Sequence, residues 1–189
     1  MIKPSCRCHC DMDRRRVTSG LLLSAFAAAS TGAWARATQT PVRADDERYM
    51  RIALDEAARG DFPFGAVIEK GGRVLATGHN SGKSTNDPTA HGEMVAIRNF
   101  IKSHPSAELN GATIYTTGEP CPMCMGAIIW CGFRRVVFAA SIQELSTRLG
   151  QIMVTSETVA AAASFANIDI TGGVFAKEAL ALFPPPVPE

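Results

Sequence analysis

Residues 111–139 read GATIYTTGEPCPMCMGAIIWCGFRRVVFA, and this stretch has the pattern of a strand, a helix and a second strand. Residues 112–116 are rich in β-branched and aromatic side chains, which favour a strand. Residues 122–131 predict a helix that begins with proline, a residue favoured in the first helical turn. Residues 135–139, which are apolar after Arg135, predict a buried strand. The cysteine segment 120–124 is therefore expected where a strand passes into a helix.

The remaining chain predicts helices that alternate with strands after an initial hairpin. A hairpin followed by alternation indicates an α/β fold, a three-layer α/β/α sandwich with a mixed sheet of about five strands. The further helices are expected at 45–59, 89–103, 143–149, 156–165 and 176–183, and the further strands at 64–69, 74–80 and 168–171.

The first 35 residues have the layout of an export signal. Arg14, Arg15 and Arg16 precede the apolar run 17–33, and Ala33-Trp34-Ala35 fits a cleavage site. The arginines favour the twin-arginine route, so we expect a periplasmic or secreted protein with no stable membrane span after cleavage. An ordinary secretory signal and an uncleaved anchor are the alternatives.

Residues before this signal include Cys6, Cys8, His9 and Cys10. They form either a second metal-binding tract or an untranslated stretch ahead of a start at Met12, and the second interpretation is favoured because the signal is complete without them. The predicted organisation is a signal at 1–35, a linker at 36–44, one domain at 45–183 and a proline-rich tail at 184–189.

The charge of the expected mature chain is close to neutral. Cleavage after Ala35 removes five of the 19 basic and two of the 18 acidic residues, which leaves 14 and 16 and a net charge of −2. No strong nucleic-acid footprint is therefore expected. Three cysteines remain (Cys121, Cys124 and Cys131), too few for a disulfide framework.

Two short clusters carry the candidate chemistry. His91, Cys121 and Cys124 supply three ligands for a zinc ion with one open position, which is typical of catalytic rather than structural zinc. Zinc lowers the pKa of a bound water to about 7, and Glu93 would be free to move protons. This set suits hydrolytic deamination of a nucleobase. Alternatives are a redox pair formed by the two cysteines, as in a periplasmic thiol oxidoreductase, and a zinc scaffold without catalysis.

Three segments resemble the cytidine and deoxycytidylate-type zinc deaminase superfamily, in its guanine deaminase and tRNA adenosine deaminase branch. They are Pro63–Val67, Asn86–Glu93 and Glu119–Ala127. The resemblance implies zinc ligation by His91, Cys121 and Cys124 with Glu93 as the proton shuttle. It covers residues 45–140 well and the C-terminal third poorly.

The same resemblance implies substrate contacts and partners. Asn80 matches an asparagine that binds the base, Phe64 falls on the pocket wall, and Trp130 matches a tryptophan of guanine deaminase-like members, although it could equally be a core residue. We expect a homodimer that acts on a small base or nucleoside, with guanine first. Deamination of tRNA adenosine or of cytosine is the alternative. Residues 170–174 and the last helix are the candidates for closing the pocket.

Overall fold

The structure, a computed structural model, describes residues 37–185. The expected export signal at 1–35, the cysteines of residues 6–10 and the end of the tail at 186–189 lie outside the described residues. Within 37–185, no helix combines the length and the apolar character that a membrane span requires.

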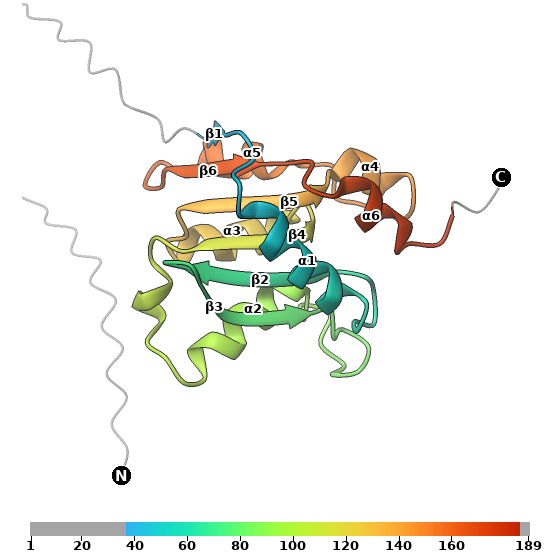
Figure 1. The fold of residues 1–189 in the computed structure, drawn as a ribbon, viewed down its shortest axis with the longest axis horizontal. Helices are drawn as coiled ribbons and strands as arrows, with labels where there is room; N and C mark the ends of the chain where they lie inside the picture. Colours follow the sequence, from blue (N-terminus) through green and yellow to red (C-terminus); the bar gives the residue numbers. More distant parts are fainter. Residues whose placement is uncertain (1–36, 186–189) are drawn as a thin grey trace, which may run out of the picture. The chain divides into compact units, whose positions relative to one another are not determined.

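A mixed six-stranded sheet forms the centre of residues 37–185 (Figure 1). Its spatial order is β1-β6-β5-β4-β2-β3. The strand β2 is antiparallel to its neighbours β3 and β4, whereas β4, β5, β6 and β1 run parallel. The strands are β1 (Ala37–Gln39), β2 (Gly65–Lys70), β3 (Arg73–His79), β4 (Thr113–Gly118), β5 (Arg135–Ala140) and β6 (Ile168–Thr171).

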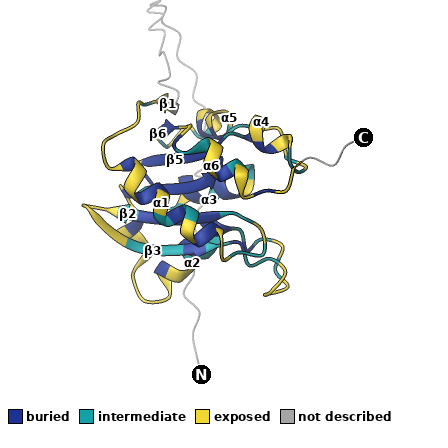
Figure 2. Cartoon of the chain, turned by 45° about the vertical axis from the view of Figure 1, so that its right-hand side comes forward, coloured by how far each residue is buried: buried dark blue, intermediate teal, exposed yellow. Residues whose placement is uncertain are grey.

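Helices cover both faces of this sheet, which confirms the three-layer α/β/α prediction. Buried residues of α1 and α6 pack on one face, and those of α2, α3 and α5 on the other. The inner strands β2, β4 and β5 are largely buried, whereas β3 at the edge is mostly intermediate or exposed (Figure 2). The helices are α1 (Asp46–Ala57), α2 (Gly92–Ile101), α3 (Pro122–Trp130), α4 (Ile142–Ser146), α5 (Ser156–Ala162) and α6 (Ala176–Ala181), and a 3₁₀ turn spans Ser106–Leu109.

The sheet has one strand more than the five that the sequence predicts. The extra strand β1 lies in the range expected to be a linker, and Ala37 pairs with Ile168 of β6. Thr40 N extends this pairing by donating to Ile170 O at 2.8 Å. A three-residue strand carries no periodic pattern of its own, so only pairing with a distant strand identifies it.

The helix α2 begins three residues later than predicted. Residues 87–91 form tight turns instead, in which Ala90 N donates to Asp87 O and His91 N to Thr89 O. The Asp87 carboxylate also accepts from Thr89 N at 2.8 Å, a local bond that competes with helix formation. His91 is consequently the extended N-cap residue of α2 rather than a member of its first turn.

Two glycines let α2 approach the sheet closely. A Cβ atom on Gly78 of β3 would lie 2.3 Å from Ala96 N, and one on Gly92 would lie 2.9 Å from Phe64 O. Real Cβ contacts are never so short, so both positions require glycine or a shift of the helix backbone. This close packing fixes the start of α2, which carries His91 and Glu93, against the ends of β2 and β3.

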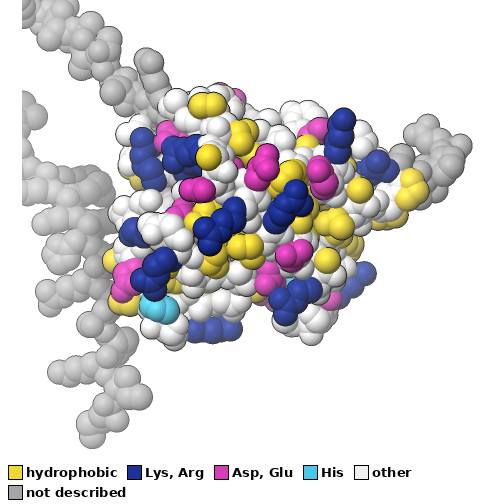
Figure 3. Space-filling view, viewed as in Figure 1, with side chains coloured by type: hydrophobic (Ala, Val, Ile, Leu, Met, Phe, Trp, Pro, Cys, Tyr) yellow, Lys and Arg dark blue, Asp and Glu magenta, His cyan; other side chains and the backbone are white. Residues whose placement is uncertain are grey.

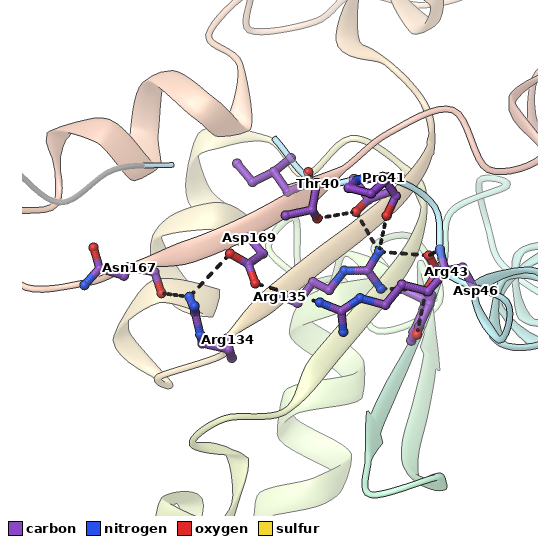
Figure 4. A network of polar contacts seen from close by, with 11 residues as sticks. Thr40, Pro41, Arg43, Asp46, Arg134, Arg135, Asn167 and Asp169 are labelled. Carbon is purple, nitrogen blue, oxygen red and sulfur yellow. Dashed lines mark hydrogen bonds and ion pairs between the residues drawn. The ribbon is translucent and has the colours of Figure 1, made fainter. Parts of the chain in front are cut away.

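A buried polar network joins α1 and the segment after β1 to the sheet (Figure 4). Arg135 of β5 donates to both carboxylate oxygens of Asp46, at 2.6 and 2.8 Å, and to Thr171 Oγ1 at 2.7 Å. Its guanidinium also reaches Pro41 O at 3.3 Å. Tyr115 adds a hydroxyl bond to Asp46, and its phenol has a raised pKa because it is buried beside that carboxylate. The network holds residues 40–46 in place.

Candidate metal and catalytic site

The three predicted zinc ligands come together at the N-termini of two helices. His91 is the N-cap of α2 and Cys121 the N-cap of α3, both with extended backbone. Cys124 lies in the first turn of α3 and is fully buried. Helix N-termini gather backbone N–H groups and a positive dipole, which stabilise thiolates.

The separations between the ligand atoms fit one zinc ion. His91 Nδ1 lies 3.7 Å from Cys121 Sγ and 3.6 Å from Cys124 Sγ. Tetrahedral zinc with ordinary Zn–S and Zn–N bonds separates sulfur from nitrogen by about 3.6 Å. All three atoms lie within 4.8 Å of one another. The donor set and its spacing therefore match a catalytic zinc site with three protein ligands.

The two thiols cannot both ionise easily without a cation. The hydrogen bond with Cys124 and the one with His91 lower the pKa of Cys121 to about 4. The pKa of Cys124 is raised instead, because its thiol donates to Cys121 and is buried. The hydrogen bond to Cys121 also raises the pKa of His91. A divalent cation offsets the repulsion between two neighbouring thiolates. The two thiols and the imidazole therefore favour a bound metal ion.

Glu93 projects from the first turn of α2 into the same site and is almost fully buried. Burial raises the pKa of its carboxyl to about 7. A carboxyl group with a pKa near neutrality can both accept and donate a proton. Glu93 is not one of the three clustered ligand residues, so it is available for proton transfer as the sequence predicts.

A pocket of about 770 Å³ opens beside these residues. Its lining is predominantly apolar, with a few polar groups, which is typical of a small-molecule site. His91, Glu93 and Cys121 form part of its wall, and Phe62 and Phe64 contribute aromatic surface.

The loop between β3 and α2 forms a second part of the wall. Lys83, Asn86 and Pro88 of this loop line the pocket. The Asp61 carboxylate holds the loop by accepting from the backbone N–H groups of Lys83 and Ser84, both at 2.8 Å. The pocket is thus bounded by ordered backbone on this side.

Two of the three predicted substrate contacts line the pocket. Asn80 is buried at the end of β3, and its Oδ1 accepts from Gly82 N at 3.2 Å. Within residues 37–185 its amide nitrogen has no acceptor, so a donor remains for a ligand. Phe64 packs edge-on against Phe183 beyond α6, with 5.1 Å between the ring centroids.

Trp130, the third predicted contact, is not in the pocket. It ends α3, its side chain is 78% exposed, and it packs against Phe165 at 4.7 Å between ring centroids. Neither interpretation of this residue, as a base contact or as a core residue, agrees with the structure. The zinc cysteines begin α3 and Trp130 ends it, so the length of the helix separates them.

The last part of the wall comes from Leu149–Ile152, between α4 and α5. The expected segment 170–174 does not line the pocket, because it belongs to the end of β6 and to a turn whose residues Gly172 and Gly173 are exposed to solvent. Glu119, the first residue of the third resembling segment, also lines the pocket. Its carboxylate accepts from the distant backbone N–H groups of Ile142 and Ser156, which no local pattern indicates.

Comparison with known proteins identifies the family to which this chain belongs. Residues 43–140 match the family described as the cytidine and deoxycytidylate deaminase zinc-binding region, and this range contains all four residues predicted for zinc binding and proton transfer. The chain belongs to this zinc-binding deaminase family.

Two individual relatives have different activities. A guanine deaminase of Bacillus subtilis is 49% identical over 99 residues, which cover 50% of this chain and 64% of that protein. A tRNA-specific adenosine deaminase of Aquifex aeolicus is 39% identical over 98 residues, covering 50% and 65%. The chain thus spans less than two thirds of the length of these relatives.

A solved structure with a similar fold is also that of a deaminase. The structure of a guanine deaminase from Nitrosomonas europaea superposes with a TM-score of 0.61 at 26% identity, covering 80% of this chain and 86% of that one. The zinc prediction agrees with the family and with the His/Cys/Cys group. The thiol oxidoreductase alternative is not supported, because the matched relatives are deaminases and the two thiols share a site with His91.

Proposed function

We propose that this chain catalyses the hydrolytic deamination of a purine base or nucleoside, with guanine as the first candidate. One observation carries the proposal: Glu93, His91 and Cys121 face a single pocket of small-molecule size, and Cys124 completes the metal ligand set. In the reaction, water supplies the oxygen of a new carbonyl group, the bond between carbon and the exocyclic amine breaks, and ammonia leaves.

The residues of the chain have separate tasks in this reaction. Zinc, held by His91, Cys121 and Cys124, would supply Lewis-acid activation of the attacking water. The Glu93 carboxylate accepts one proton from that water and passes it to a ring nitrogen. It then accepts the second proton from the new hydroxyl group, as the carbonyl forms, and passes it to the leaving amine. The Asn80 amide donates a hydrogen bond to an acceptor on the base. Phe64 supplies apolar surface for the ring.

Guanine is preferred over tRNA adenosine for two reasons. The Bacillus subtilis guanine deaminase is the more similar of the two relatives described above. Residues 36–189 carry a net charge of −2, and on the face shown in Figure 3 basic and acidic side chains are interspersed. Binding to tRNA depends on neutralising phosphates with a concentrated basic surface. The tRNA-specific relatives make tRNA adenosine the second candidate.

An ammonia-release assay on the purified, zinc-loaded protein tests this function. Guanine, adenine, cytosine, their nucleosides and a tRNA with adenosine at the wobble position are the substrates. Glu93→Gln should keep its zinc and slow ammonia release by about 10²- to 10⁴-fold, the usual contribution of a general acid–base group. Glu108→Gln, which changes an exposed carboxylate, is the control. Full activity of Glu93→Gln would refute the assigned proton transfer.

The proposal includes two further expectations from the sequence, export through the N-terminal signal and a homodimer. The signal pattern of residues 1–35 supports the first, and the family resemblance supports the second. Sedimentation of the purified protein tests the homodimer, and a single monomeric species at micromolar concentration would contradict it.

A further inference from the structure

One carboxylate holds both ends of the segment that forms a wall of the pocket. Glu119 Oε2 accepts from Ile142 N at 2.9 Å, and Oε1 accepts from Ser156 N at 2.8 Å. Ile142 begins α4 and Ser156 begins α5. The pocket residues Leu149–Ile152 lie on the chain between these two anchor points.

Glu119 is itself fixed next to the zinc ligands. It lies two residues before Cys121, its side chain is 8% exposed, and its backbone N–H donates to Ala140 O at 2.7 Å. Ser156 adds a second link, because its buried hydroxyl donates to Pro120 O at 3.1 Å. The segment that carries the zinc ligand and the two ends of the wall thus share one set of buried hydrogen bonds.

Hydrogen bonding gives the wall little other support. Within the described chain, residues 149–154 form hydrogen bonds only with residues between the two anchor points Ile142 and Ser156. These bonds run from Leu149 N to Leu145 O and from Val154 N to Ile152 O. Leu149 packs against the core, but Ile152 and Met153 are 63% and 58% exposed, so packing holds the later part of the wall weakly as well. Because the wall has few contacts of its own, its position depends on the two anchor points, Ile142 and Ser156.

We propose that Glu119 is a positioning residue for the substrate, which couples the wall at 149–152 to the zinc-ligand segment 120–124. This inference rests on the proposed function, since it assigns a role in the same pocket. Glu119 acts through Ile142 and Ser156 rather than by transferring protons. It therefore governs how well a base is held in the pocket.

The test compares Glu119→Gln with the wild type, both as zinc-loaded full-length protein. The glutamine has the same shape, but its NH₂ group cannot accept, so one of the two amides loses its partner. We expect amide hydrogen exchange at Ile142 or Ser156 to rise by about tenfold or more. Tryptic cleavage after Arg148, the residue immediately before the wall, should also become faster. The zinc content should stay equal to that of the wild type.

Kinetics with guanine separate positioning from chemistry. A displaced wall should raise KM by about tenfold while kcat changes less, because the lost interaction holds the bound base. Ser156→Ala, which removes only the link to Pro120, should shift exchange and KM in the same direction by a smaller factor. This milder variant also serves as the test if Glu119→Gln does not fold.

Glu144→Gln is the matched control. Glu144 is an exposed residue of α4 that completes a capping box with Ser141, so the substitution makes the same change of charge at the same helix start without touching Glu119. Its KM should equal that of the wild type. Equal effects of Glu144→Gln and Glu119→Gln on KM would overturn the proposal.

Two other results would overturn it: unchanged exchange at both amides in Glu119→Gln, or a fall in kcat alone. The exchange and cleavage measurements need no substrate. If the wild type released no ammonia from any base, the proposed function would fail, and these two measurements would still decide whether Glu119 positions the wall.

Discussion

Arg135 Nη1 lies 2.6 Å from Asp46 Oδ1, although 89 residues separate the two in the chain. Both side chains are at most 2% exposed. This ion pair joins β5, in the parallel half of the sheet, to the first residue of α1. Since a buried charge without its partner is very unfavourable, the pair is a sensitive point of the fold.

Removing one member of the pair should destabilise the domain strongly. Arg135→Met leaves the Asp46 carboxylate buried without its partner, and we expect the free energy of unfolding to fall by about 3–5 kcal/mol. The neighbouring Arg134 is the control, because its ion pair with Asp169 is exposed on the arginine side, and Arg134→Met should cost about 1 kcal/mol or less. Urea denaturation measures both, and similar losses for the two variants would contradict the assignment.

The same pair predicts how stability depends on acid. Burial raises the pKa of Asp46, but the hydrogen bonds from Arg135 and from Arg43 N outweigh it and hold the pKa below the ordinary aspartate value of 3.8. The unfolded chain then takes up a proton before the folded one, so this contribution is complete above pH 3.8 and is lost as pH falls further. Asp46→Asn should lower stability at neutral pH and remove this part of the acid dependence.

Urea midpoints between pH 7 and pH 2.5 check that prediction. Asp55→Asn, at an exposed position of the same helix, should retain the wild-type acid dependence. An unchanged slope in Asp46→Asn would show that other carboxylates control the acid response.

Zinc binding should depend on Cys124 and not on Cys131. Cys124→Ser replaces a soft thiolate ligand with a hydroxyl, so the purified variant should hold little zinc, whereas Cys131→Ser should keep the wild-type content. Because a metal that binds only the folded state stabilises it, chelation should lower the thermal midpoint of the wild type. Metal analysis and thermal scans measure both effects, and normal zinc content in Cys124→Ser would exclude it as a ligand.

Asn80 and Trp130 should differ sharply in their effect on catalysis. Asn80→Ala removes the amide that lines the pocket and should lower kcat/KM for the substrate by about tenfold, the cost of one hydrogen bond. Trp130→Ala changes an exposed side chain outside that pocket and should leave kcat/KM unchanged. Steady-state kinetics decide between them. A larger loss for Trp130→Ala would restore the sequence-based interpretation of that residue.

Export should depend on the arginines of the N-terminal signal. Replacing them together (Arg14→Lys, Arg15→Lys and Arg16→Lys) keeps the charge but removes the twin-arginine pattern, so the variant should stay inside the cell. Fractionation of the producing cells measures this. Normal export of the triple variant would indicate the general secretory route instead.

Several elements could be predicted because their signals are local. The strand β5 is a continuous apolar run from 136 to 140, and the helix from Pro122 begins with a residue favoured at that position. The zinc set could be predicted because ligand chemistry restricts it to few residue types at characteristic spacings, as in His91 and the Cys121–Cys124 pair. The sequence also predicts Glu93 as the proton-transfer group, from its place two residues after His91, and this role stays a prediction.

Other features depend on contacts between distant parts of the chain. The strand β1 exists through its pairing with β6, and Trp130 is exposed because the turn of α3 directs it away from the sheet. Glu119 meets Ile142 and Ser156 only after β4 and β5 have brought these segments together.

The sequence by itself determined the chemistry of the site, because metal ligation and proton transfer require particular side chains at particular spacings. The tertiary structure alone decided the shape of the pocket. Its wall at 149–152 has no residue type that marks it, and its position follows from hydrogen bonds to a carboxylate that lies more than twenty residues away in the chain.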